Sequence, residues 1–345
     1  METQTTTAVN VSRVNHKKKR KVRFGRVFFF LFLILMFAGG GFLYGTNQGL
    51  QLREMLLGTV LSTYHPQYEK YLKFFLPQSE IDKLYNARNH PQAVQSTINK
   101  EKQKRIITDQ SVQVDTVETP NYTAKIMVIH DPTMIHLEGT RYSDKGQPLS
   151  DLIKENKGIA GINAGGFFDP RGNGSGGQMI GIDISDGNVL SVPAGGRNVP
   201  ALIGGFLKDG QFITGNYSVN QLLSLGVRNA VSFGPQLIVN GVNQVTGMVD
   251  GAWGWAPRTA IGQEANGSVV MIATDGRFYW NKTHRGASMS DLVNLFDRYN
   301  VTNAIAMDGG GSTTMIKDGQ LLLKPATNTD VGMRYLPDAW IVIPH

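Results

Sequence analysis

The chain has 345 residues, with 34 Lys and Arg against 27 Asp and Glu, and it contains no Cys. This length corresponds to one or two domains that bury a sizeable core. Hydrophobic residues make up 41% and charged residues 18%, a balance that excludes a largely disordered chain. The lack of cysteine excludes a disulfide scaffold, a thiolate metal site and a cysteine nucleophile.

The excess charge of +7 lies in one short segment. Residues 1–26 contain eight basic residues and one acidic residue, whereas residues 27–345 contain 26 of each sign. A nucleic-acid-binding domain instead spreads its basic residues over a folded surface. We therefore expect no nucleic-acid partner, and we interpret residues 1–26 as a basic cytoplasmic tail.

An apolar run follows this tail. Residues 27–44 form a stretch of 18 residues without a charge, close to the ~20 that span a bilayer as a helix. Basic residues on its N-terminal side favour a cytoplasmic location for that side. We expect a transmembrane anchor over 27–44, which makes this a single-pass protein of the cell membrane with an extracellular C-terminal domain. A cleaved signal peptide is the alternative, because residues 38–41 are small.

Residues 45–105 are predicted to form a helical stalk next to the membrane. The apolar residues of 50–61 recur at helical spacing. A second helical run ends at Pro77, and Ser79 is positioned to cap a third helix whose first turn is acidic.

Residues 106–345 are predicted to form one catalytic domain, because short apolar runs alternate there with turns. Ser288 begins a capping box for one helix, and the first two strands flank Asp131-Pro132 and are predicted to pair as a hairpin. Many strands with few helices between them predict an α+β fold with a mixed β-sheet and flanking helices. The predicted strands are 124–129, 134–137, 159–163, 178–184, 189–192, 201–207, 211–213, 230–233, 236–239, 258–263, 269–274 and 304–307.

The most informative motif comes directly after the run 304–307, where Asp308 precedes three glycines and three hydroxyl residues. Glycines let the backbone approach a ligand closely, and successive amides in such a turn form an anion-binding concavity. A carboxylate beside such a loop suits a phosphate-bearing substrate. A glycine turn capped by an aspartate is the alternative interpretation. The candidate substrate-binding residues of this motif are Gly309, Gly310, Gly311, Ser312 and Thr313.

Two other segments contain candidate binding residues. Asn163 ends a predicted strand before a glycine loop that carries Phe167, so its amide suits a sugar hydroxyl and the ring suits a sugar face. Arg258 begins another strand near Trp253 and Trp255 and offers a guanidinium fork for phosphate oxygens. For each segment an ordinary turn or core-packing role is the alternative.

The remaining polar residues suggest no cofactor and no metal. His136 and Glu138 share one strand face, but no third ligand lies nearby in sequence, and no HExxH motif is present. Ser175 lacks the first glycine of a Gly-x-Ser-x-Gly elbow. A serine hydrolase triad is therefore not expected.

Five segments together resemble the phosphodiester glycosidase family, and the resemblance covers about residues 110–345. They are 162–169, 232–241, 258–263, 273–277 and 303–315. The family implies cleavage of a sugar's anomeric C–O bond to a phosphodiester, with α-N-acetylglucosaminidase-like activity. Its motif positions fall on Asn163, Arg258, Asp275, Arg277, Asp308, Gly309, Gly310, Ser312 and Thr313.

The resemblance assigns a hypothesis to each catalytic group. A phosphate ester leaves more readily than a sugar alkoxide, so two tasks remain: stabilising the anomeric carbon and holding the phosphate. Asp308 is expected to perform the first. Arg258 and the amides of 309–311 are expected to perform the second. Asp275 is the candidate base for water, and Arg277 is a candidate substrate-binding residue.

The expected substrate is a glycosyl phosphate, most naturally within a cell-wall or exopolysaccharide polymer such as teichoic acid. Three alternatives remain at this stage. A non-catalytic envelope protein would bind such a polymer through the same loop, and a membrane glycopolymer transferase would need several clustered arginines. A phosphodiesterase that breaks the P–O bond usually recruits two metals.

Overall fold

The computed structural model describes residues 24–61, 73, 77–99, 109–169 and 174–345. The chain divides into two compact units, Met1–Leu50 and Gln51–His345. In the first unit, α1 (Phe24–Gly45) covers the predicted anchor. This helix is long and apolar enough to cross a membrane, by criteria that a signal sequence also meets. Most of the predicted basic tail lies outside the described residues.

Two helices precede the strands of the second unit. Most of α2 (Asn47–Leu61) belongs to this unit, and α4 (Gln78–Asn89) buries Ile81 and Leu84. Pro77 occupies the N-cap of α4, so the prediction that Ser79 caps this helix is wrong. Proline has no N–H to leave unpaired and its φ is fixed near the helical value, so it starts a helix readily. The boundary predicted between residues 105 and 106 lies outside the described residues.

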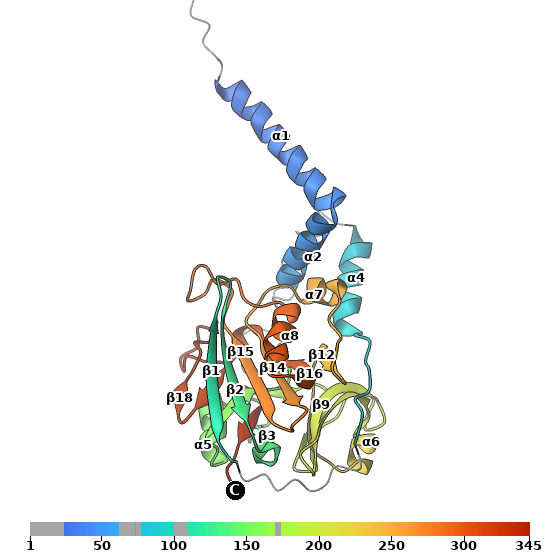
Figure 1. The fold of residues 1–345 in the computed structure, drawn as a ribbon, viewed down its shortest axis with the longest axis vertical. Coiled ribbons are helices and arrows are strands. Elements are labelled where there is room, and N and C mark those ends of the chain that lie inside the picture. Colours follow the sequence, from blue (N-terminus) through green and yellow to red (C-terminus); the bar gives the residue numbers. More distant parts are fainter. Residues whose placement is uncertain (1–23, 62–72, 74–76, 100–108, 170–173) are drawn as a thin grey trace, which may run out of the picture. The chain divides into compact units, whose positions relative to one another are not determined.

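The described strands form three large sheets and one two-stranded sheet (Figure 1). The largest has seven strands in the order β1-β2-β15-β14-β16-β12-β13. Its strands are β1 (Val112–Glu118), β2 (Thr123–Ile129), β12 (Gln236–Val239), β13 (Val242–Asn243), β14 (Thr259–Glu264), β15 (Val269–Thr274) and β16 (Val301–Met307).

Two five-stranded sheets complete the frame, in the orders β10-β9-β11-β7-β8 and β18-β17-β4-β19-β3. In the second of these, β19 lies between β4 and β3. The strands of the first are β7 (Asp183–Ser185), β8 (Asn188–Ser191), β9 (Ala201–Leu207), β10 (Phe212–Tyr217) and β11 (Val227–Ser232). Those of the second are β3 (Ile135–Gly139), β4 (Ala160–Asn163), β17 (Met315–Lys317), β18 (Gln320–Leu321) and β19 (Asp338–Val342). The two-stranded sheet pairs β5 (Phe167–Phe168) with β6 (Gln178–Met179).

The α+β class is confirmed, but the arrangement of the strands differs from the prediction in two ways. Every pairing between described strands is antiparallel, so the expected mixed sheet is instead three antiparallel sheets, as short turns between strands favour. The predicted hairpin over Asp131-Pro132 is wrong. The chain there makes the 3₁₀ turn η2 (Pro132–Met134), after which β3 leaves β2 and pairs with β19 in another sheet.

The remaining helices are short. They are α5 (Leu149–Glu155), α6 (Val219–Ser224), α7 (Gly247–Trp253), α8 (Met289–Asp297) and the 3₁₀ turn η3 (Gly310–Ser312). The predicted capping box of α8 is confirmed, since Ser288 Oγ accepts from the Asp291 N–H and the Asp291 carboxylate accepts from Ser288.

The central strands of the seven-stranded sheet are buried on both faces, and β16 shows this most clearly. Ala304 and Ala306 face the core layer that contains α8, while Ile305 and Met307 face the layer that contains Phe206 and Trp340 from the other sheets. Alternate side chains of a strand point to opposite faces, so both layers clamp β16. Its end, where Asp308 follows, is thereby held in a fixed position (Figure 1).

Candidate active site

Asp308 is held at the end of β16 by backbone contacts. Its N–H donates to the Ala164 carbonyl oxygen at 2.9 Å, and its Oδ1 accepts from the Gly309 N–H at 3.0 Å. Burial raises the pKa of the Asp308 carboxyl, while Ser312, Arg334 and Arg277 act in the opposite direction. The site thus holds one carboxyl group in an environment that makes its charge costly unless cations are near.

The three glycines bring the backbone close to neighbouring side chains. The Gly309 N–H donates to Asp308 and the Gly310 N–H donates to the Pro257 carbonyl oxygen at 2.8 Å, so these two amides are already engaged. Gly310 has a φ of +63°, and a Cβ there would lie 2.7 Å from Nη2 of Arg277. A Cβ on Gly311 would lie 3.0 Å from Nε of Arg334. The loop therefore admits two guanidinium groups, and the anion-binding role of its amides stays a prediction.

Four arginines act electrostatically on this one carboxyl group: Arg88, Arg258, Arg277 and Arg334. Burial, followed by the charges of Arg277 and Arg88, lowers the pKa of Arg258 to about 9. Burial and the charge of Arg334 likewise lower the pKa of Arg277. Such mutual repulsion among cations is relieved when an anion binds between them.

Arg277 is the least committed of these groups. Its guanidinium makes no hydrogen bond to any residue that the structure describes, and its backbone has a φ of +60°. Left-handed backbone on a residue with a side chain is uncommon and costs stability, and it gathers at functional sites. The structure therefore supports the prediction that Arg277 is a binding residue without testing it.

Two fully buried hydroxyl groups lie next to Asp308, those of Ser312 and Thr313. Ser312 lies against the Asp308 carboxyl and lowers its pKa, although the contact falls short of good hydrogen-bond geometry, and Oγ1 of Thr313 has no partner within the described part of the chain. Burying a polar group without a partner costs about 1–3 kcal/mol. An unsatisfied hydroxyl beside a carboxyl and several guanidinium groups calls for an explanation, and a bound ligand would supply one.

Asn163 and Arg258 hold backbone, which differs from the direct substrate contacts predicted for them. Nδ2 of Asn163 donates to the Asp308 carbonyl oxygen at 2.7 Å, and its Oδ1 accepts from Thr259 Oγ1 and the Thr314 N–H. Nη2 of Arg258 donates to the carbonyl oxygens of residues 253 and 254 at 2.6 and 2.7 Å. Both side chains are buried and keep the neighbouring loops in place.

Asp275 is paired with a histidine that the sequence did not single out. Its Oδ2 lies 2.8 Å from Nδ1 of His284, and its Oδ1 accepts from the Thr123 N–H at 2.7 Å. The carboxylate fixes the imidazole and leaves Nε2 as the other functional atom. Because both oxygens are engaged, Asp275 is placed to act through His284.

Phe167 and Arg334 lie against each other, next to Gly311. Phe167 is 9% exposed, and the Arg334 guanidinium carbon lies 5.9 Å from its ring centroid. Nη1 of Arg334 lies 3.8 Å from an Asp169 carboxylate oxygen. Arg334 was missed because it is a single arginine in a loop without a motif. It lies in the segment before β19, a strand that pairs with β4.

A pair of buried acids supports the glycine loop before Phe167. Oδ1 of Asp338 accepts from the Gly165 N–H at 2.5 Å, and Asp183 contacts Asp338. Burial raises the pKa of Asp338 to about 6 and raises that of Asp183 well above its usual value. The two carboxyl groups are therefore protonated more readily than ordinary surface acids. Nothing in the sequence marks them, since they are 155 positions apart.

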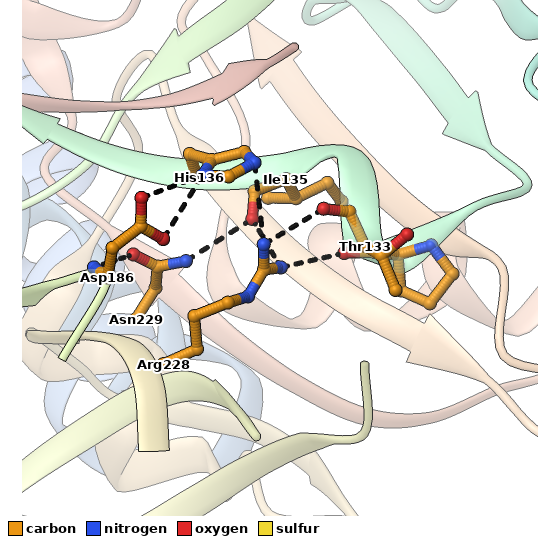
Figure 2. Close-up of polar contacts among 7 residues, drawn as sticks. Thr133, Ile135, His136, Asp186, Arg228 and Asn229 are labelled. Carbon is orange, nitrogen blue, oxygen red and sulfur yellow. Dashed lines mark hydrogen bonds and ion pairs between the residues drawn. The ribbon is translucent and has the colours of Figure 1, made fainter. Parts of the chain in front are cut away.

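A separate cluster brings a third potential ligand to His136 and Glu138. The ligand atoms of these two residues and Asp186 lie within 4.8 Å of one another. Figure 2 shows His136 between Asp186 and Arg228, with Nδ1 3.2 Å from the carboxylate and Nε2 3.4 Å from Nη1 of Arg228. A guanidinium can only donate, so Nε2 accepts and Nδ1 carries the proton that Asp186 accepts. A cation at Nδ1 would reverse this arrangement, and the expectation of no metal stays a prediction.

The fold and the site define a class of protein: an α+β domain that places Asp308 among several arginines, an arrangement that suits an anionic ligand beside an acid. Comparison with known proteins gives the family. The phosphodiester glycosidase family model matches residues 156–343, and the chain belongs to this family.

Individual relatives agree with this assignment. The chain is 30% identical over 203 residues to the SPbeta prophage-derived uncharacterized protein YomE of Bacillus subtilis (strain 168), covering 56% of the chain and 29% of that protein. It is 30% identical over 190 residues to mouse N-acetylglucosamine-1-phosphodiester alpha-N-acetylglucosaminidase, covering 50% of the chain and 34% of that enzyme. The chain thus spans about a third of the length of these relatives.

A solved structure shows the same fold. The catalytic domain of the zebrafish N-acetylglucosamine-1-phosphodiester alpha-N-acetylglucosaminidase, described as auto-inhibited by its pro-peptide, matches with a TM-score of 0.58 at 18% identity. The match covers 74% of this chain and 88% of the zebrafish chain. The overall fold is therefore shared over most of this chain.

Proposed function

We propose that this protein hydrolyses the glycosidic bond between a sugar's anomeric carbon and a phosphodiester. The observation that carries the proposal is the gathering of four guanidinium groups within electrostatic reach of Asp308. A phosphodiester supplies an anion that these groups can bind. The family membership and the names of its members support the same chemistry.

In this proposal Arg277 and Arg334 hold the phosphate. Both guanidinium groups lie against the glycine loop, where their nitrogen atoms approach within 3.0 Å of the positions that Cβ atoms of Gly310 and Gly311 would occupy. Their planar forks match phosphate oxygens. Thr313 supplies a further donor through its unpartnered hydroxyl, and the Ser312 hydroxyl lies beside Asp308.

Asp308 is the group proposed to face the anomeric carbon. As the bond from this carbon to the phosphate oxygen breaks, electrons leave with the phosphomonoester and positive charge grows on the sugar, where a carboxylate stabilises it. Water then adds its oxygen to the sugar. The Asp275–His284 pair is the proposed base that takes the water's proton, with the 2.8 Å contact orienting the imidazole. Asn163 keeps the segment from Asp308 to Thr314 in position, and Arg258 does the same for residues 253 and 254.

An isotope experiment tests the reaction. The full-length protein in detergent is incubated with an α-N-acetylglucosamine-1-phosphate alkyl diester in ¹⁸O water, and the products are analysed by mass spectrometry. Label in the free sugar supports cleavage of the anomeric C–O bond. Label in the phosphate would identify a phosphodiesterase and would contradict the proposed role of Asp308 at the anomeric carbon. Binding of wall polymer without release of sugar would identify a non-catalytic binding protein.

The proposal extends to the cell envelope. We propose that α1 anchors the protein as a single-pass membrane protein with its catalytic unit outside the cell, because the basic residues before the helix favour the cytoplasm. The substrate is then a glycosyl-phosphate polymer such as a wall or exopolysaccharide chain. Carbonate extraction of membranes and digestion of intact cells by added protease test this topology. Protection of the catalytic unit from the protease contradicts it.

A further inference from the structure

The α4 helix brings an arginine to the candidate active site from outside the residues that define the family. Arg88 lies near the end of α4, well before residue 156, where the family match begins. Its guanidinium carbon lies 4.9 Å from the ring centroid of Trp253, and Nη1 donates to the Leu61 carbonyl oxygen at 3.1 Å. Burial lowers the pKa of Arg88, and the charge of Asp308 partly offsets this. Arg88 is thus within electrostatic reach of the proposed catalytic carboxyl.

The segment after α4 is fixed to the sheets by hydrogen bonds. Val94 exchanges two bonds with the Gln236 side chain, both of 2.8 Å. The Ser96 N–H donates to the Thr214 carbonyl oxygen at 2.9 Å, and Ser96 Oγ accepts from the Thr214 N–H at 2.9 Å. These contacts fix the chain to β12 of the seven-stranded sheet and to β10 of a five-stranded sheet, only a few residues beyond Arg88. The position of Arg88 is therefore built into the fold of the second unit.

A pocket of about 320 Å³ opens between this segment and the loop that contains Gly166. Arg88 and Pro91 line one side, Gly166 lines the loop side, and Phe233 and Trp253 supply aromatic rings whose centroids are 6.0 Å apart. A Cβ on Gly166 would lie 3.3 Å from the Phe233 ring, so the glycine keeps this wall open. Most of the lining is apolar, which suits a group with an apolar face.

One residue that lines this pocket has a buried donor without a partner. Trp253 is only 9% exposed, and its indole Nε1 has no acceptor among the described residues. A buried indole N–H normally finds an acceptor. Together, an unpartnered donor, a guanidinium and two rings indicate a ligand that carries an anion, an acceptor and an apolar body.

We propose that Arg88 and this pocket form the binding subsite for the alcohol side of the phosphodiester. In this arrangement Arg88 pairs with a phosphate oxygen, and the pocket receives the apolar or ring-shaped part of the alcohol. The subsite rests on the proposed function, because it presumes a phosphodiester at Asp308. It adds a binding residue that the catalytic domain alone does not contain, so α4 is part of the active site.

Kinetics on the full-length protein test the subsite. The methyl and benzyl diesters of α-N-acetylglucosamine-1-phosphate are compared, and we expect a KM about tenfold lower for the benzyl diester. Arg88→Met is expected to raise KM by about 10- to 100-fold with little change in kcat, the range that the loss of one charge-assisted bond gives. Arg88→Lys recovers part of the loss. Arg53→Met is the matched control, because Arg53 lies on α2, 2.9 Å from Glu80, outside the pocket.

Calorimetric titration with benzyl phosphate separates this proposal from the proposed reaction. If no diester is cleaved but benzyl phosphate binds the wild type and not Arg88→Met, the reaction fails and the subsite stands. Equal binding by wild type and Arg88→Met, with equal thermal stability, overturns the subsite. Equal KM values for the two diesters also overturn it. An increase in kcat for Arg88→Met would mean that α4 covers the site rather than completing it.

Discussion

Two polar clusters in the second unit contain the same kinds of residues and treat them in opposite ways. Around Arg228, each Nη nitrogen has acceptors: Nη1 contacts the Thr133 carbonyl oxygen and His136, and Nη2 contacts the carbonyl oxygens of Pro132 and Ile135. Around Asp308, by contrast, only burial and the charges of Arg334 and Asp308 act on Arg277, and the Thr313 hydroxyl is buried without a hydrogen-bond partner among the described residues.

The number of hydrogen bonds made within the protein distinguishes a cluster that stabilises the fold from one that is suited to bind a ligand. The Arg228 cluster fastens the η2 turn and β3 to β11, and its donors are almost all used within the protein, apart from a buried Nε. The Asp308 cluster retains unused donors and repelling cations, and that arrangement stabilises the protein only when an anion binds. Carboxylate and arginine content alone would not distinguish the two sites, but hydrogen-bond saturation does.

The largest expected effect comes from Asp308→Asn. The substitution keeps the shape and the Gly309 contact but removes the charge that stabilises the anomeric carbon, so kcat should fall on the order of 10³-fold or more. Turnover is measured with the diester substrate, and circular dichroism with thermal melting verifies the fold. Retained activity in a folded variant would sink the assignment of Asp308.

Arg334→Met is expected to lower kcat/KM by about 100-fold, because the proposed phosphate loses a bidentate donor. Arg334→Lys should recover only part of this, since an ammonium cannot reproduce the planar fork. Arg141→Met serves as the control, because Arg141 is an exposed residue whose Nη1 lies 3.0 Å from Glu155. Equal losses in the Met variants of both arginines would contradict a phosphate contact.

Arg228→Met sharpens the comparison from the structural side. It removes four Nη contacts and should lower the free energy of unfolding by about 2–4 kcal/mol, measured by urea denaturation. The kcat/KM of the folded protein should stay within about twofold of the wild type. A large loss of activity without a loss of stability would contradict this prediction and would show that the Arg228 cluster takes part in the reaction.

The smallest expected effect concerns pH and the acids Asp183 and Asp338. A carboxyl whose pKa is raised on folding stabilises the native state below its unfolded value near 4, and this contribution is lost as pH rises through about 6. Stability should therefore fall between pH 4 and 8. Asp183→Asn removes the repulsion and should gain roughly 1–3 kcal/mol relative to wild type at pH 8. Equal pH slopes for the two proteins in thermal melting would refute the pairing.

Parts of the fold and site follow from sequence, and others depend on tertiary structure. The bounds of β9, β12 and β15 agree with the predicted runs, because alternation and turn residues are local signals. Asp308 and Arg277 were also identified from their motifs.

Local signals failed where contacts decide the role. Asn163 and Arg258 have the residue types of ligand-binding groups, but their partners are backbone atoms from distant segments. Arg334, Arg88 and Asp338 carry no motif, and only folding brings them to Asp308. The predicted hairpin failed for the same reason, since β3 finds its partner in β19.

The place of β19 has a consequence for the order of folding. This strand inserts between β4 and β3, where Asp338 pairs with Gly139, a residue far away in the sequence. It also brings the Asp338 carboxylate to the Gly165 N–H. Contacts between such distant segments close late, because the intervening chain must first lose its freedom. The active site is therefore expected to assemble last, and a chain still emerging across a membrane would be inactive until this strand docks.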